Sequence, residues 1–229
     1  SISGNIANYG TLNFNRSDAV LFGGDISGTG SLIKGTANTL TLTGNNTYSG
    51  ATTLSAGVLQ AGSNSAFGTG AMTFTAGTLS SDSSTARTVV NPITLGGSVT
   101  FGNTVNNGAL TLSGAGTLTA NRTLTFNSDV IYSGAISGPG FAITKVGPGA
   151  LTLSGANTNS GTTTLGIPSS TDPVDGGQLN LNSAGALGTG AFTCNSGSID
   201  NTSGSPVVIS SAGAIALSGP AATGRASGQ

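Results

Sequence analysis

The chain has 229 residues, of which 6% are charged, and its formal net charge is −1. It contains no histidine, which excludes Ser–His and Cys–His nucleophiles and imidazole metal sites, and its single cysteine, Cys194, permits neither an internal disulfide nor a thiolate zinc site. The few charges are scattered and no apolar run approaches about 20 residues, so the sequence indicates neither a nucleic-acid partner nor a membrane-spanning helix.

Short apolar-x-apolar motifs recur along the chain and predict strands. With 39 glycines, no glutamate and few lysines, no stretch has good helix propensity, whereas Thr, Val, Ile and Phe favour strands. The residue between each apolar pair is usually Thr, Asn or Ser, so one face of each strand would be apolar and the other polar. In chain order the expected strands centre on Leu12/Phe14, Leu40/Leu42, Met72/Phe74, Ile93/Leu95, Val99/Phe101, Leu110/Leu112, Leu124/Phe126, Leu151/Leu153, Leu179/Leu181, Val207/Ile209 and Ile215/Leu217.

Strands this short, separated by Gly and Asn turns, predict a solenoid whose rungs stack on one another. A sandwich or barrel usually has strands of about five to six residues, and a propeller would repeat every 40 to 50 residues, roughly, with its own blade signature. The expected fold class is therefore all-β, a β-helix. Rungs of about 20 residues would give roughly 11 coils.

The sequence of the first half recurs in the second half. TLTLTGNNTYSG at 39–50 resembles ALTLSGANTNSG at 150–161, and SAFGTGAMTF at 65–74 resembles GALGTGAFT at 185–193. Such self-similarity is the signature of a repeat architecture. The asparagines of the first pair fall at turn signals, where an Asn side chain can bond the local backbone; they are Asn45, Asn46, Asn157 and Asn159.

The repeat predicts a single β-helical solenoid over residues 1–229, made of two related units at 1–110 and 111–229. The second unit carries an insertion, GIPSSTDPVDGG, which predicts a loop at 166–177.

That loop contains the one candidate interaction site, formed by Asp172, Pro173 and Asp175. Two acids close in sequence could bind Ca²⁺ or hydrolyse a sugar. The simpler interpretation is a solvated, turn-rich loop. No catalytic, metal-binding or cofactor-binding residue is predicted elsewhere. Cys194 is expected to be a small buried residue, with an exposed crosslinking thiol as the alternative.

Residues 26–74 resemble the passenger-associated transport repeat of bacterial autotransporters, through ISGTGSLIKGTANTLTLTGNNTYSGATTLSAGVLQAGSNSAFGTGAMTF. Residues 136–165 resemble it less regularly, and Asn159 stands there in place of Tyr48. The resemblance implies a right-handed parallel β-helix that is exported and displayed outside the cell, on a bacterial surface. It also implies adhesion, aggregation or a stalk role more often than catalysis.

Three functions fit the sequence. The first is a non-enzymatic surface β-helix, an autotransporter-type stalk or adhesin, whose partners would be surface glycans, host or sister cells. The second is an extracellular fibre subunit that associates with itself head-to-tail, because open terminal rungs offer unpaired strand edges. The third is a carbohydrate-active β-helix enzyme that uses the aspartates of the inserted loop.

Overall fold

The computed structural model describes residues 4–167, 175–210, 213 and 215–217, and the regular structure of these residues is entirely β-strand. They contain no helix long and apolar enough to cross a membrane. The strands form four sheets, in which every paired strand runs parallel to its neighbour.

The largest sheet has ten strands. They are β3 (Val20–Phe22), β6 (Thr39–Leu42), β8 (Val58–Ala61), β10 (Thr78–Ser81), β13 (Thr100–Phe101), β16 (Arg122–Phe126), β19 (Ile143–Val146), β21 (Thr163–Leu165), β23 (Phe192–Cys194) and β25 (Ile215–Leu217). A seven-stranded sheet contains β2 (Thr11–Phe14), β5 (Ser31–Lys34), β7 (Thr52–Leu54), β9 (Met72–Phe74), β12 (Ile93–Leu95), β15 (Gly116–Leu118) and β18 (Ile136–Ser137). A six-stranded sheet contains β11 (Arg87–Val89), β14 (Leu110–Leu112), β17 (Val130–Tyr132), β20 (Leu151–Leu153), β22 (Gln178–Leu181) and β24 (Ser198–Asp200), and a two-stranded sheet contains β1 (Ile6–Ala7) and β4 (Ile26–Ser27).

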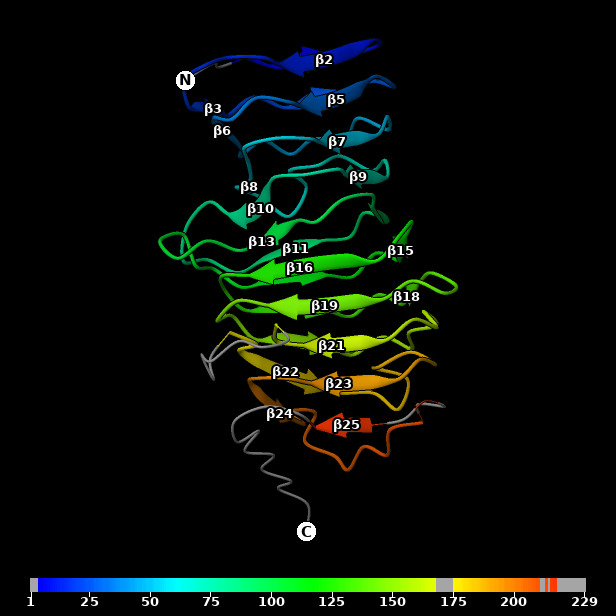
Figure 1. Cartoon of the computed structure of the whole chain (residues 1–229). Helices are drawn as coiled ribbons and strands as arrows, with labels where there is room; N and C mark the ends of the chain where they lie inside the picture. The colour runs from blue at the N-terminus through cyan, green and yellow to red at the C-terminus, as the bar shows by residue number, and fades with distance from the viewer. Residues whose placement is uncertain (1–3, 168–174, 211–212, 214, 218–229) are drawn as a thin grey trace.

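Consecutive strands lie on different faces, and the chain returns to the same face one rung later (Figure 1). The strands nearest the viewer, such as β16 and β19, run from right to left while the chain descends from β2 towards β25, so the coil is right-handed. Backbone groups are paired between rungs, which lets strands of two to five residues form long sheets. The prediction of an all-β, right-handed parallel β-helix is confirmed.

The solenoid has about nine turns, fewer than the roughly 11 expected from the sequence, because its rungs differ in length. The 10 stacked strands of the largest sheet are separated by nine steps. Leu40 pairs with Leu59, only 19 residues further on, whereas Leu165 pairs with Cys194, 29 residues further on. This longest rung contains the insertion at 166–177. Long corner loops therefore increase the number of residues per turn, so the chain forms fewer turns than uniform 20-residue rungs would give.

Alternation along each strand places the apolar side chains inside the coil. In β6, Leu40 and Leu42 are fully buried, while the two threonines beside them are half-buried on the outer face. Phe74, Phe101 and Phe126 form a column inside the coil: Phe74 meets Phe101 edge-to-face at 6.1 Å between ring centroids, and Phe101 stacks on Phe126 at 5.5 Å. Full burial of one such apolar side chain contributes about 1.5–3 kcal/mol, so this column holds the middle rungs together.

Equivalent strands of the two sequence copies lie on different faces. Leu40 lies in β6 of the ten-stranded sheet, but its counterpart Leu151 lies in β20 of the six-stranded sheet. Likewise, Leu54 in the seven-stranded sheet corresponds to Leu165 in the ten-stranded sheet. Five steps of the ten-stranded sheet lead from β3 to β16, and β17, which repeats the sequence of β3, lies on the next face. Matching surface features of the copies therefore point in different directions.

Candidate functional site

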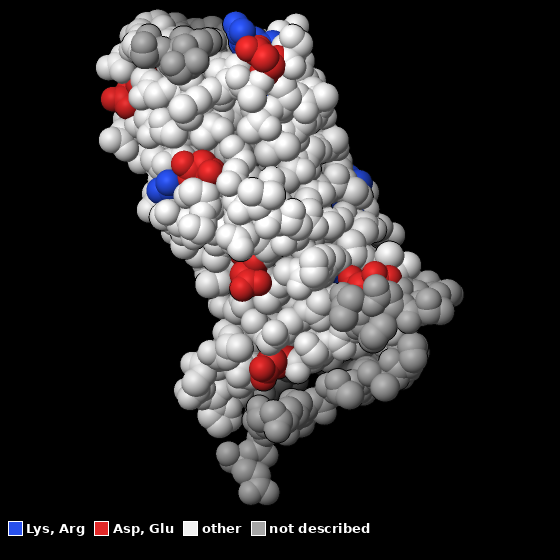
Figure 2. Space-filling model, turned by 90° about the vertical axis from the view of Figure 1, so that its left-hand side faces the viewer, with Lys and Arg blue, Asp and Glu red and all other residues white. Residues whose placement is uncertain are grey.

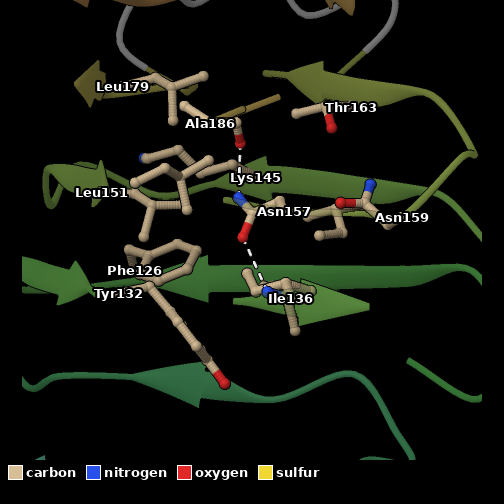
Figure 3. A pocket seen from close by; sticks show the side chains of 13 residues that line it. Phe126, Tyr132, Ile136, Lys145, Leu151, Asn157, Asn159, Thr163, Leu179 and Ala186 are labelled. Atoms are coloured by element: carbon tan, nitrogen blue, oxygen red, sulfur yellow. Dashed lines mark hydrogen bonds between the residues drawn. The ribbon is translucent and has the colours of Figure 1, made fainter. Parts of the chain in front are cut away.

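Asn46, in the repeated turn GNNTYSG, connects three rungs. Its side-chain oxygen accepts a hydrogen bond from the backbone N–H of Ile26 at 2.8 Å, and its side-chain nitrogen donates to the carbonyl oxygen of Ala66 at 2.6 Å. Asn157 makes the equivalent pair of bonds in the second copy, also at 2.8 and 2.6 Å (Figure 3). The expectation that these side chains bond the local backbone is therefore corrected: both reach residues at least 20 positions away.

Lys34 is the second buried polar group of the repeat. It points inward from the end of β5 and is fully buried. Its Nζ donates hydrogen bonds to the carbonyl oxygen of Thr36 and, at 3.2 Å, to that of Ala56 on the next rung. Burial lowers the pKa of Lys34 because it disfavours the charged form.

Lys145 occupies the equivalent position in the second copy. Its Nζ donates to the carbonyl oxygens of Gly147 at 3.0 Å and Gly176 at 2.6 Å, and it lies 5.4 Å from the ring centroid of Phe126. Burial lowers its pKa to about 8, although the charge of Asp129 acts in the opposite direction. Each lysine thus satisfies two carbonyl oxygens at a corner between rungs.

The lysine corners need glycine. Gly57 and Gly177 have φ angles of +69° and +58°, a conformation that glycine adopts without steric cost. A Cβ atom at Gly57 would lie 2.7 Å from Lys34 Nζ, and one at Gly177 would lie 3.0 Å from Lys145 Nζ. Side chains at these two positions would therefore strain the backbone and press on the ammonium groups.

Tyr48 fills the core of the first copy. It is fully buried, and its hydroxyl group lies 2.6 Å from the hydroxyl oxygen of Thr52. Burial raises the pKa of Tyr48 to about 12, although the hydrogen bond to Thr52 acts in the opposite direction.

Asn159 takes the place of Tyr48 in the second copy and leaves an interior cavity beside it. Asn159 is 1% exposed, and its Nδ2 has no hydrogen-bond partner among the described residues. The cavity has a volume of about 10 Å³ and a mostly apolar lining that includes Phe126, Ile136, Leu151 and Leu179 (Figure 3). It is a packing difference between the copies, and Lys145 also lines it.

The candidate interaction loop is only partly within the described residues. Asp172 and Pro173 lie outside them. Asp175 is described, and its carbonyl oxygen accepts a hydrogen bond from the N–H of Gly147 at 2.7 Å. The next residue, Gly176, accepts the bond from Lys145, so the end of the loop is attached to the lysine corner. In the described part of the chain, no three metal-binding side chains come together.

The outer surface carries few charges. Figure 2 shows isolated acidic and basic groups on an otherwise uncharged face. Arg16 and Asp18 form an exposed ion pair at 2.7 Å, and Arg87 and Asp82 form a half-buried one at 2.8 Å. Exposed pairs of this kind contribute about 0–1 kcal/mol.

Cys194 is buried in β23, as expected from the sequence. Its inward position pairs with Leu165 of the previous rung, so it belongs to the apolar interior. Burial raises the pKa of the Cys194 thiol, which disfavours the reactive thiolate.

Comparison with known proteins places this geometry in a family context. The family model of the passenger-associated-transport-repeat matches residues 32–61 and 143–166. These segments contain both buried lysines, and the second match ends where the insertion begins, before Gly176 and Gly177 of the second corner. No curated protein and no solved structure matched the chain. The two matches of the family model confirm the prediction of passenger-associated transport repeats.

The solenoid and the two repeats together support a structural domain of the autotransporter-passenger type. The repeat family implies export to the cell surface.

Sequence reasoning missed the buried lysines, although a signal for them exists. Lys34 follows the inward-facing Leu32 by two positions, and Lys145 follows the inward-facing Ile143 by two positions. In a strand with period two, that spacing puts both lysines on the inner face.

Proposed function

We propose that this chain is a non-enzymatic structural segment of an exported autotransporter passenger, which acts as a stalk or adhesin on the bacterial surface. The observation that carries the proposal is the use of the repeat's polar residues in holding rungs together. Lys34, Asn46 and Tyr48 are all buried and bonded within the solenoid. A sequence whose distinctive residues serve stacking is suited to extending a rod.

The partner we favour is a second copy of the same chain on a sister cell. The net charge is −1, so two copies repel each other only weakly, and near-zero net charge favours association. Because the surface carries few charges, contacts between copies would rely on hydroxyl and amide groups and on exposed apolar side chains such as Tyr9 and Val105. Such contacts would depend little on ionic strength, since salt screens charges and leaves neutral hydrogen bonds largely unaffected.

Location and adhesion can be tested separately. Antibodies raised against the purified chain should label intact bacteria of the source strain as strongly as permeabilised ones. Labelling only after permeabilisation would contradict surface display. For adhesion, beads coated with the purified chain should clump with one another, and clumping should persist when salt is raised to about 1 M.

Two results of the bead experiment would contradict self-association as the adhesive contact. Beads that stay dispersed but bind immobilised glycans or host cells would identify those as the partners. Beads that bind nothing would leave the chain as a stalk without adhesive activity. Turnover of a polysaccharide by the purified chain would contradict the non-enzymatic assignment, and filaments of the free chain in electron micrographs would favour a fibre subunit.

A further inference from the structure

The cavity beside Asn159 combines a defined volume with an unpartnered polar group. Asn159 Nδ2 has no hydrogen-bond partner among the described residues, although the side chain is almost completely buried. A buried polar group without a partner costs about 1–3 kcal/mol, so native proteins generally satisfy such groups with protein atoms or ordered water. The volume of about 10 Å³ is close to the minimum that holds one water molecule.

Thr163 supplies a second polar group on the cavity wall. Its Oγ1 donates a hydrogen bond to the carbonyl oxygen of Leu187 at 3.2 Å, and a hydroxyl that donates can still accept. Figure 3 shows Thr163 and Asn159 on the same side of the cavity. A neutral guest between them could accept from the Asn159 amide and donate to the Thr163 hydroxyl.

Other guests fit the site less well. Lys145 lines the cavity, but its Nζ is bonded to Gly147 and Gly176, so it is committed to the corner. A cation would meet this ammonium group and an apolar wall, and burying a charge without a partner is costly. An apolar guest would leave the Asn159 amide unsatisfied. The remaining chemistry is that of one small, neutral molecule that both donates and accepts.

We propose that the cavity beside Asn159 binds one structural water molecule, which links Asn159 Nδ2 to Thr163 Oγ1. The first copy satisfies the same place with protein atoms alone, because the Tyr48 hydroxyl bonds Thr52, the counterpart of Thr163. The second copy thus exchanges a phenol ring for an amide and a water. The rung at Asn159 is held by an exchangeable molecule, so it opens more readily than the rung at Tyr48.

The proposal can be tested on the wild-type chain by two measurements. A crystal structure at high resolution should show one ordered water within hydrogen-bond distance of Asn159 Nδ2 and Thr163 Oγ1. In solution, the Asn159 side-chain amide should show a nuclear Overhauser effect to a bound water. A dry cavity, or an Asn159 amide bonded to a protein atom, would overturn the proposal.

Two variants extend the test. Asn159→Leu keeps the branched shape of the side chain, adds volume and removes its amide, so the water should disappear from the crystal structure. Asn159→Tyr should displace the water by restoring the arrangement of Tyr48, and should raise Tm by about 2–4 °C. Water that remains in the cavity of the Asn159→Leu variant would show that the amide does not hold it. If either variant fails to fold, the two measurements on the wild-type chain still show whether the cavity holds a water molecule.

Exchange of backbone amides gives an independent readout. Amides of β21, next to the cavity, should exchange faster than those of β7, its counterpart next to Tyr48. Asn159→Tyr should slow exchange in β21 and leave β7 unchanged. Equal exchange in the two wild-type strands would contradict the weaker rung.

Discussion

Lys145 Nζ lies 2.6 Å from the carbonyl oxygen of Gly176, a residue 31 positions further along the chain. This bond joins the corner of one rung to the end of the inserted loop, and Lys34 forms the equivalent cross-rung bond to Ala56 in the first copy. The rotation between the copies puts the two corners on different faces of the rod. The solenoid therefore repeats a buried ammonium group as a structural element, with a predictable dependence on pH.

We expect the free energy of unfolding to rise between about pH 8 and pH 10. Burial lowers the pKa of Lys145 to about 8, whereas an unfolded lysine titrates near 10.5. In this window the unfolded chain binds more protons than the folded chain, so stability increases with pH. The gain should be on the order of 1–3 kcal/mol by urea unfolding at a series of pH values. Lys34, whose pKa is also lowered, acts in the same direction.

Above about pH 10 the trend should reverse. Burial raises the pKa values of Tyr48 and Tyr132, so these groups ionise in the unfolded chain first. Lys145→Met, which keeps the length of the side chain without its charge, should flatten the rise between pH 8 and 10. A stability that falls steadily from pH 8 upwards would show that the ammonium form is the one the folded state prefers.

Replacing Asn46 with Leu should destabilise the solenoid by about 2–6 kcal/mol. The substitution leaves the N–H of Ile26 and the carbonyl of Ala66 unpaired in the interior, at about 1–3 kcal/mol each. The measurement is the urea midpoint at constant m-value. Asn45→Ala is the matched control, since Asn45 is exposed and its substitution should change stability by less than about 0.5 kcal/mol. Equal effects of the two substitutions would mean that the bridge between rungs adds nothing.

Alternation predicts the inward side chains of the strands it identifies, but it does not identify β5 or β19, and the strand expected at Val207/Ile209 does not form. Their spacing predicts that Leu40 and Leu42 share one face of a strand, and both are fully buried. The number of turns could not be obtained in this way. Rung length depends on how many residues each corner loop uses, and a rung of 19 residues and one of 29 have the same strand pattern.

The polar interior was harder to predict. Strand alternation places Lys34 and Lys145 on the inner face. Lysine side chains are rarely buried, however, so the residue type alone predicts that both are exposed. The sequence around Asn46 predicts a turn, but it does not show which groups the side-chain amide will bond. Its partners, Ile26 and Ala66, come close to Asn46 only when the rungs stack. Of the predicted loop residues, Asp175 is described, and the role of the loop stays a prediction.

Substitutions of Tyr48 should separate the ring from the hydroxyl. Tyr48→Phe removes the contact with Thr52 and should cost about 0.5–1.5 kcal/mol. Tyr48→Asn copies the second repeat and should cost about 3–5 kcal/mol, because it also removes the ring from the core. Thermal unfolding of both variants alongside the wild type gives the comparison. If Tyr48→Phe is as damaging as Tyr48→Asn, the hydroxyl and not the ring holds this rung.

The inserted loop at 166–177 is the feature that the second copy has and the first lacks, so we expect it to contribute to contacts between copies. Replacing Asp172 and Asp175 together with Ala removes the hydrogen-bonding groups of both side chains and should weaken bead clumping about fivefold, the effect of losing roughly 1 kcal/mol of binding. The bond from Gly147 reaches the backbone carbonyl of Asp175 and survives the substitution, and urea unfolding of the variant checks that the fold is kept. Asp18→Ala, which removes an exposed acid of the first copy, is the control and should leave clumping as it was. Clumping that is unaffected by the double substitution would identify the loop aspartates as solvated turn residues, and an equal loss in the control would point to net charge as the cause.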